Sequence, residues 1–183
     1  NEYLDCTSGL FAAIIGHSNP EIVAAVKEQV EKVTQLSALQ ITEPMTLLAE
    51  MLAEVTPESI RKSYFANGGG ESVEVAIKMA RQYTGKDEVI VLKNAFHGLS
   101  YGAMTATGAV KYRQGFGPLL HGFFRAPHAY CYRCPFDLEY PACDLRCAQE
   151  IENIITDTAI STVSQGDIGT VLVEPVQGRG GII

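Results

Sequence analysis

The sequence predicts an α/β fold with a mainly parallel sheet, because segments of helical character alternate with short apolar runs. The clearest apolar runs are Val89–Leu92 and Thr170–Glu174, each of a length typical of a strand buried on both faces. Parallel strands need a crossover connection, which a helix usually supplies. The alternation of strands and helices therefore favours a parallel sheet that is covered by helices.

Two amphipathic helices are expected near the N-terminus, over Pro20–Val33 and Glu43–Val55. In both segments, apolar side chains recur at helical spacing and charged side chains fall mostly elsewhere. Asn19 suits the N-cap of the first helix, and Pro57 follows the end of the second. Consecutive amphipathic helices are more often scaffold than site, so we assign no chemistry to them.

Further along the chain, the pattern predicts a short strand over Lys62–Ala66 and a helix over Glu71–Thr84. Residues 126–145 hold most of the cysteines and several prolines, and we expect them to be irregular. A last helix is expected over Leu145–Thr158. No repeat, linker or low-complexity tract interrupts this order.

The composition excludes several classes of protein. With 46% hydrophobic and 19% charged residues, the chain is neither fibrous nor disordered in character. Its net charge of −7 and scattered basic residues argue against a nucleic-acid partner. No apolar stretch is long enough to span a membrane, and the first residues do not resemble a secretory signal. We therefore expect a cytoplasmic protein with neither nucleic-acid nor membrane partners.

The strongest local feature is the bend Asn67–Gly70 between the expected strand and the helix that begins near Glu71. Consecutive glycines let the backbone turn tightly and bring its N–H groups close to a ligand. A helix start adds unpaired N–H donors and the positive end of the helix dipole, which suits a phosphate group. The spacing fits neither a Walker loop nor a dinucleotide-binding fingerprint. A plain strand–helix turn is the alternative reading of these residues alone.

Two further features follow the expected strands. Phe96 and His97 come shortly after Val89–Leu92, where open α/β sheets bind ligands, and they could cover a flat ring and tune its charge. A packed Phe and a hydrogen-bonded His are the alternative. Glu174 ends the second apolar run, a costly place for a carboxylate unless it is hydrogen-bonded or functional.

These features occur together in a known family. The stretch Phe65–Arg81 resembles the class III aminotransferase pattern F-x-N-S-G-A-E-A-V-E-x-A-I-K-x-A-R. Phe96–Gly98 with Met104–Gly108 resembles F/Y-H-G … M-x-x-T-G, and Glu174–Gly178 resembles E-P-V-Q-G. The motifs occur in the family's order over nearly the whole chain. The family includes 4-aminobutyrate and acetylornithine aminotransferases, and the chain resembles its N-terminal portion.

The resemblance implies a cofactor and a set of roles. The fold would be part of the large domain of fold-type-I enzymes that depend on pyridoxal 5'-phosphate (PLP), with residues 1–45 as an N-terminal segment on the dimer and substrate side and residues 46–183 as the partial PLP-binding domain. The amides of Gly69 and Gly70 would hold the cofactor phosphate, and Phe96 would lie over its ring. The remaining implied positions are His97 and Glu174 at the cofactor and Leu10, Phe11 and Arg179 on the substrate side.

Three departures qualify these roles. Gly68 stands where the family usually has Ser, which removes a hydroxyl near the phosphate. Arg179 stands where 4-aminobutyrate enzymes carry Glu, which puts that substrate in doubt. The family's Schiff-base Lys and the Asp that binds the pyridinium nitrogen come after the segment that ends at Ile183. We therefore expect no catalytic residue of that kind in this chain, and no transaminase activity from the 183 residues alone.

The resemblance implies that the parent enzyme transfers an amino group between an amino acid or amine and a 2-oxo acid, as a homodimer. An amino-acid racemase or epimerase on the same scaffold is an alternative, and formation of a keto acid would distinguish the two. A non-catalytic fragment kept for structure or assembly is another.

Four cysteines cluster at Cys131, Cys134, Cys143 and Cys147. Four thiolates could hold zinc in a tetrahedral site. However, the spacing of the second pair is three rather than two residues, and no glycine-rich knuckle surrounds it. Some class III aminotransferases are similar here too, with the cysteines on a surface excursion. We therefore expect free thiols or occasional disulfides, and no metal.

Overall fold

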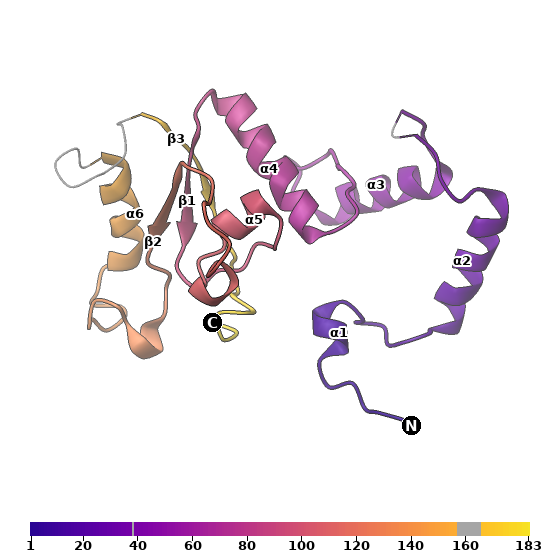
Figure 1. The fold of residues 1–183 in the computed structure, drawn as a ribbon, viewed down its shortest axis with the longest axis horizontal. Helices are drawn as coiled ribbons and strands as arrows, with labels where there is room; N and C mark the ends of the chain where they lie inside the picture. Colours follow the sequence, from indigo (N-terminus) through magenta and orange to yellow (C-terminus); the bar gives the residue numbers. More distant parts are fainter. Residues whose placement is uncertain (38, 157–165) are drawn as a thin grey trace. The chain divides into compact units, whose positions relative to one another are not determined.

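The computed structural model describes residues 1–37, 39–156 and 166–183, and it divides the chain into two units, Asn1–Ser63 and Tyr64–Ile183 (Figure 1). The division expected at residue 45 falls inside a helix of the first unit. The functions assigned to the two parts of that division stay predictions.

The N-terminal unit contains three helices, α1 (Ser8–Phe11), α2 (Pro20–Lys32) and α3 (Glu43–Val55). The predicted helices α2 and α3 are confirmed. Asn19 caps α2 by accepting a hydrogen bond from the Glu21 amide at 3.0 Å, and Thr42 caps α3 from the Met45 amide at 3.4 Å. No described residue of this unit is buried, so the apolar faces of both helices lie exposed.

The C-terminal unit is an α/β layer structure around a small parallel sheet. Its strands are β1 (Glu88–Leu92), β2 (Phe123–Ala126) and β3 (Ile168–Leu172), in the order β2-β1-β3. Both neighbouring pairs are parallel, which confirms the predicted sheet type. Its helices are α4 (Gly69–Thr84), α5 (Tyr101–Ala106) and α6 (Arg146–Thr156), with single 3-10 turns at Val110–Tyr112 and Cys131–Arg133.

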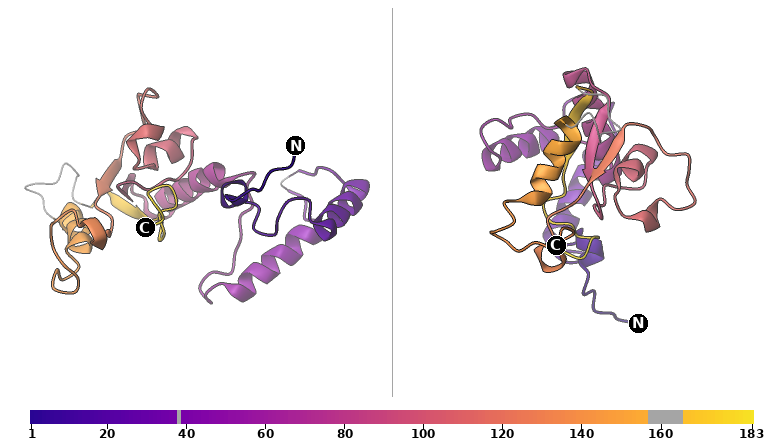
Figure 2. Two further views of the ribbon diagram at one scale, coloured as in Figure 1. Left: turned by 90° about the horizontal axis from the view of Figure 1, so that it is seen from below. Right: turned by 90° about the vertical axis from the view of Figure 1, so that its left-hand side faces the viewer.

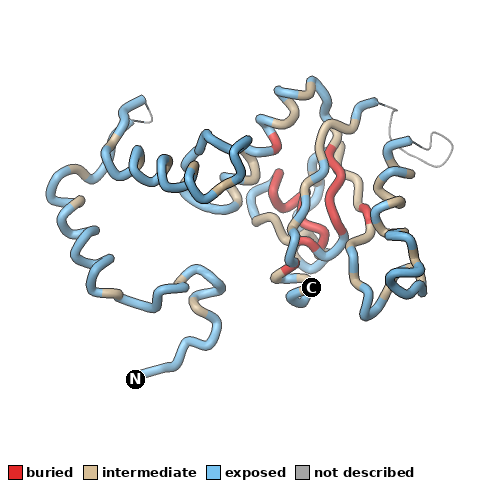
Figure 3. The backbone as a smooth tube through the Cα atoms, turned by 180° about the vertical axis from the view of Figure 1, so that it is seen from behind, coloured by how far each residue is buried: buried red, intermediate tan, exposed pale blue. Residues whose placement is uncertain are grey.

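The core of this unit lies on both faces of the central strand β1. Val89 and Val91 pack against Ile77 of α4 and Ala106 of α5, whereas the opposite face of the strand packs against α6. Figure 2 shows α6 on one side of the sheet and α5 on the other, and Figure 3 shows burial concentrated in β1 and α5. Val89, Ile90 and Val91 are all 0% exposed, as expected for a strand covered on both faces.

The observed elements differ from the expected ones at several bounds and in one strand. Lys62–Ala66 is irregular, so the predicted strand is wrong there, because no neighbouring strand in the described residues pairs with it. The helix expected from Glu71 begins at Gly69, and the strand expected from Thr170 begins at Ile168. Residues 157 and 158, the end of the last predicted helix, lie outside the described residues. Among the described helices, none has the length and apolar character that a membrane span requires.

Candidate functional site

The N-terminal end of α4 presents backbone donors without partners. Gly68 is the N-cap residue, with an extended backbone and no side chain that could cap the helix. Ser72 is the first amide of the helix that is bonded, to the Gly68 carbonyl at 3.0 Å. The amides of Gly69, Gly70 and Glu71 donate to no group among the described residues. Three unpaired N–H groups and the positive end of the helix dipole therefore lie together.

The loop that leads into α4 is held by the helix itself. The Glu71 carboxylate accepts hydrogen bonds from the Asn67 amide at 2.8 Å and from its side-chain nitrogen at 3.2 Å. This contact resembles one half of a capping box, in which a carboxylate in the first turn of a helix accepts a hydrogen bond from a donor just before it. It orders the bend without occupying the amides of the glycines.

The loop after β1 lies directly against the N-terminal end of α4. Gly98 has a φ of +136°, and a Cβ atom added there would lie 2.9 Å from Gly70 Cα and 2.9 Å from Ala103 Cβ. Only glycine allows both this backbone conformation and this close approach. The contact brings Phe96 and His97 to the same place as the unpaired amides.

Phe96 forms the aromatic part of this arrangement. Its ring meets Tyr112 edge-on, with centroids 4.9 Å apart, and the Arg179 guanidinium carbon lies 5.7 Å from its centroid. Its amide donates to Glu174 Oε2 at 2.9 Å. The ring is therefore held by an aromatic neighbour, a cation and a backbone bond.

Glu174 joins the ends of two strands. Besides the Phe96 amide, it accepts a hydrogen bond from the Gly178 amide at 3.0 Å through Oε1. The nearby Gln177 is 2% exposed and donates from Nε2 to the Lys93 carbonyl at 3.0 Å. The two side chains thus tie the segment after β3 to the segment after β1. Both oxygens of the carboxylate are satisfied, as its half-buried position requires.

His97 occupies a site that favours its neutral form. Its amide donates to Thr107 Oγ1 at 3.0 Å, whereas its Nε2 atom is buried and has no partner within the described part of the chain. Burial lowers the pKa of His97 below 6.5, and the Glu174 carboxylate offsets only part of this effect. The imidazole is therefore uncharged at neutral pH and keeps one ring nitrogen free to bond.

Glu74 links α4 to the start of α5, next to this loop. Its Oε1 atom accepts hydrogen bonds from Ser100 Oγ at 2.6 Å, Gly102 N at 2.7 Å and Ala103 N at 3.0 Å. Burial alone would raise the pKa of Glu74, but the three hydrogen bonds outweigh burial and the pKa lies below 4.5. The carboxylate thus bridges α4 and the start of α5, and it fixes the two elements around Gly98.

The structure brings most of the predicted site residues into one unit. Gly69, Gly70, Phe96 and His97 lie at the contact between α4 and the loop after β1, and Glu174 and Arg179 reach Phe96 from the segment after β3. Leu10 and Phe11 belong to α1 of the N-terminal unit, and their substrate-side role stays a prediction.

Three supporting residues escaped the sequence analysis: Glu74, Thr107 and Tyr112. Thr107 is fully buried, and it could have been suspected because it belongs to the motif Met104–Gly108. Glu74 likewise belongs to the motif Phe65–Arg81, whereas Tyr112 acts through a contact across the fold that no local pattern indicates.

The four clustered cysteines are free and line one small cavity of about 20 Å³ between β2 and α6, together with His128 and aromatic side chains. The described residues contain no group of three or more His, Cys, Asp or Glu side chains arranged to hold a metal ion.

The residues at α4 fit the phosphate end of PLP. A Cβ atom added at Gly68 or Gly69 would meet nothing within 4 Å, so space is open beside the unpaired amides. An anion placed there would be bound by N–H donors at a helix start, an arrangement that favours phosphate groups. Phe96 belongs to the loop whose Gly98 contacts Gly70, and its aromatic ring is a surface on which a flat ring could rest.

Comparison with known proteins identifies the family of the chain. The family model for class-III aminotransferases matches residues 1–183. An acetylornithine aminotransferase from Methanopyrus kandleri is 37% identical over 100% of this chain and 40% of its own length. A putrescine aminotransferase from Pectobacterium atrosepticum is 35% identical over 100% of this chain and 36% of its own length.

Solved structures of transaminases are also similar to this chain. An (S)-enantioselective omega-transaminase from Thermomicrobium roseum has a TM-score of 0.88 and 35% identity, over 98% of this chain and 41% of its own. A PLP-bound amine transaminase from an uncultivated Pseudomonas species has a TM-score of 0.86 and 30% identity, over 98% of this chain and 42% of its own. The chain thus spans about 40% of the relatives it matches. Because the family model matches the chain from its first described residue to its last, this chain belongs to the class-III aminotransferases.

Proposed function

We propose that this chain provides the phosphate- and ring-binding part of a PLP site in an aminotransferase. The whole protein would transfer an amino group between an amino acid or amine and a 2-oxo acid. The observation that carries the proposal is the set of unpaired amides at Gly69, Gly70 and Glu71, which lies against the loop that bears Phe96. Family membership gives this geometry its chemical meaning.

Each residue has a distinct role in this proposal. The amides of Gly69 and Gly70 bind the phosphate, with the dipole of α4 adding to the attraction. Phe96 packs against the ring, and Glu174 is a positioning residue because it bonds to the Phe96 amide. His97 supports the same wall without adding a charge, since burial keeps it neutral. PLP itself supplies an electron sink when it is bound.

Arg179 is proposed to act on the substrate side. Its guanidinium lies over the Phe96 ring, and it forms no ion pair with any described residue. A guanidinium binds a carboxylate through two parallel hydrogen bonds, so Arg179 suits the carboxylate of an amino acid or a 2-oxo acid. For Leu10 and Phe11 of α1, a substrate-side role is proposed from the resemblance to the family alone.

We further propose that the protein is a cytoplasmic homodimer. The apolar faces of α2 and α3 support dimerisation, because Leu48, Met51 and Val55 of α3 are exposed and need cover. Free cysteines at all five positions are in keeping with a reducing compartment.

Binding of pyridoxamine 5'-phosphate, compared with pyridoxamine, tests the proposed cofactor site. The amine form avoids the reactive aldehyde, which would attach to surface lysines. We expect calorimetry to show at least about tenfold tighter binding of the phosphorylated form, since charge-assisted hydrogen bonds contribute about 1.5–3 kcal/mol each. Equal affinities for the two compounds would contradict the proposal.

A further inference from the structure

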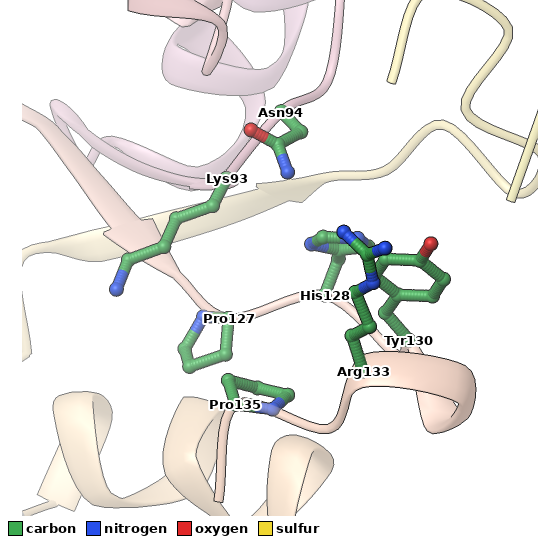
Figure 4. A pocket seen from close by; sticks show the side chains of 7 residues that line it. All are labelled: Lys93, Asn94, Pro127, His128, Tyr130, Arg133 and Pro135. Atoms are coloured by element: carbon green, nitrogen blue, oxygen red, sulfur yellow. The ribbon is translucent and has the colours of Figure 1, made fainter. Parts of the chain in front are cut away.

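A second polar pocket lies at the carboxyl edge of the sheet, where β1 and β2 end. It has a volume of about 230 Å³ and is lined by Lys93, Asn94, His128, Tyr130 and Arg133, with prolines between them. Figure 4 shows Asn94 pointing into this space, with Arg133, His128 and Tyr130 together on one side of it, and with Lys93 on the other side, where its ammonium end is directed away from Arg133. Carboxyl edges of parallel strands are common ligand sites in α/β proteins.

This pocket is separate from the site at α4. The N-terminal half of α4 packs on the face of β1 that carries Val89 and Val91. The pocket lies between Lys93 and Asn94, which follow β1, and the segment that follows β2 and leads to α6, which covers the opposite face of the sheet. None of its lining residues is Gly69, Gly70, Phe96, His97 or Glu174, and the link between the two places is the Lys93 carbonyl, which accepts a hydrogen bond from Gln177 Nε2.

The charges in the pocket are uncompensated. Lys93 and Arg133 line it, no acidic residue does, and neither cation forms an ion pair with a described residue. The chain as a whole carries a net charge of −7. A pocket lined by two unpaired cations therefore differs in charge from the chain as a whole. Such a pocket attracts anions.

His128 supplies a hydrogen-bonding group that is buried from solvent. Its Nε2 atom is buried and has no partner among the described residues, and its ring stacks on Tyr130 with centroids 5.8 Å apart. Burial lowers the pKa of His128 below 6.5, so a neutral ring presents either a donor or an acceptor there. A buried polar atom without a partner is costly, and a bound ligand would satisfy it.

We propose that this pocket binds a small oxyanion, a molecule that presents a carboxylate or phosphate group to Arg133, Lys93 and His128. Its volume lies below the roughly 300–1,000 Å³ of pockets for drug-sized ligands, so the ligand is no larger than a short carboxylic acid or a phosphate. The Asn94 amide offers a further donor for the same group. Nothing in this proposal depends on the cofactor site at α4.

Titrations followed by nuclear magnetic resonance test this proposal, with inorganic phosphate and succinate as separate probes. The His128 ring reports on the pocket, and the Gly69 amide reports on α4, so the two sites are read independently. We expect at least one probe to shift the His128 resonance in a saturable way. The probe that binds more tightly distinguishes a phosphate ligand from a carboxylate ligand.

Two charge-removing variants make the test specific. Arg133→Gln should weaken the binding seen at His128 by about tenfold or more, because charge-assisted bonds are lost. Lys27→Gln removes the same charge from an exposed position on α2 and should leave the binding unchanged. The proposal is overturned if neither probe shifts His128, or if both variants weaken binding equally.

Discussion

Replacing Gly69 with Asp should strengthen the fold and weaken cofactor binding at the same time. A side chain at this position meets nothing within 4 Å, so neither Asp nor the neutral Asn clashes with the structure. Gly69 is the first residue of α4, where a carboxylate stabilises a helix by about 0.3–1 kcal/mol. The same carboxylate would repel a phosphate bound at the amides.

The magnitude of that repulsion follows from Coulomb's law. A single charge about 5 Å from a phosphate dianion costs about 2 kcal/mol at the dielectric constant of water, and more where water is excluded. We therefore expect Gly69→Asp to bind pyridoxamine 5'-phosphate at least about tenfold more weakly than Gly69→Asn. Both variants lose the same backbone freedom of glycine, so their difference isolates the charge.

Calorimetric titration gives the affinities, and urea denaturation gives the stabilities. Relative to Gly69→Asn, Gly69→Asp should have a higher free energy of unfolding and a lower affinity for pyridoxamine 5'-phosphate. Equal affinities of the two variants would refute the assignment of these amides to the phosphate. Pyridoxamine, which has no phosphate, serves as the control ligand and should bind both variants alike.

Four other predictions concern the supports of the site. Ile90→Ala should lower the free energy of unfolding by about 2–5 kcal/mol in urea, whereas the exposed Val110→Ala should change it by less than about 0.5 kcal/mol; equal effects would contradict the assigned core. Gly108→Ala should lower the melting temperature, because its Cβ would press on the backbone after β1, at about 1–3 kcal/mol; an unchanged melting temperature would argue against that contact. Because its folded-state pKa is depressed, Glu74 stabilises the fold above its unfolded pKa and loses this effect as pH falls through the folded value. As the pH is lowered, the free energy of unfolding should therefore decrease less in Glu74→Gln than in the unchanged protein. Identical pH dependence in the two proteins would exclude the effect. The pKa of His97 measured by nuclear magnetic resonance should lie below 6.5, so stability falls as pH drops below that value; a pKa above 6.5 would mean that the Glu174 charge outweighs burial.

Local patterns sufficed where a single segment determines its own structure. The helices α2 and α3 were predicted because their caps and apolar spacing are contained in the segments themselves. The strand β1 was predicted from its continuous apolar run, which its complete burial explains. The glycine bend was proposed as a binding feature because consecutive glycines let the backbone turn tightly and bring its N–H groups close to a ligand, and that role stays a prediction.

Tertiary contacts account for what the sequence analysis missed. The strand β2 has only four residues, and it is defined by its pairing with β1 rather than by a pattern of its own. Lys62–Ala66 has a strand-like composition but no partner strand among the described residues. β-propensity reflects packing against neighbours, so it is a poor guide to short segments.

In the candidate site, too, local motifs indicated some residues and tertiary contacts determine the others. Gly69, Gly70 and Phe96 were proposed from motifs, whereas the contacts of the Glu74 carboxylate were not foreseen although Glu74 belongs to the same motif as the glycines. Glu74 bridges α4 and α5, which are distant in sequence. Only the folded chain brings the Glu74 carboxylate oxygen close to the backbone amides that donate to it. The pocket beside Arg133 likewise arises from two segments that meet only at the sheet edge.

A crystal structure of the protein with pyridoxamine 5'-phosphate tests the central claim most directly. If the account is correct, phosphate oxygens will lie about 2.7–3.2 Å from the backbone nitrogens at the start of α4, with the ring of the compound against Phe96. A phosphate bound elsewhere, with those nitrogens hydrogen-bonded to protein or facing solvent, would contradict it.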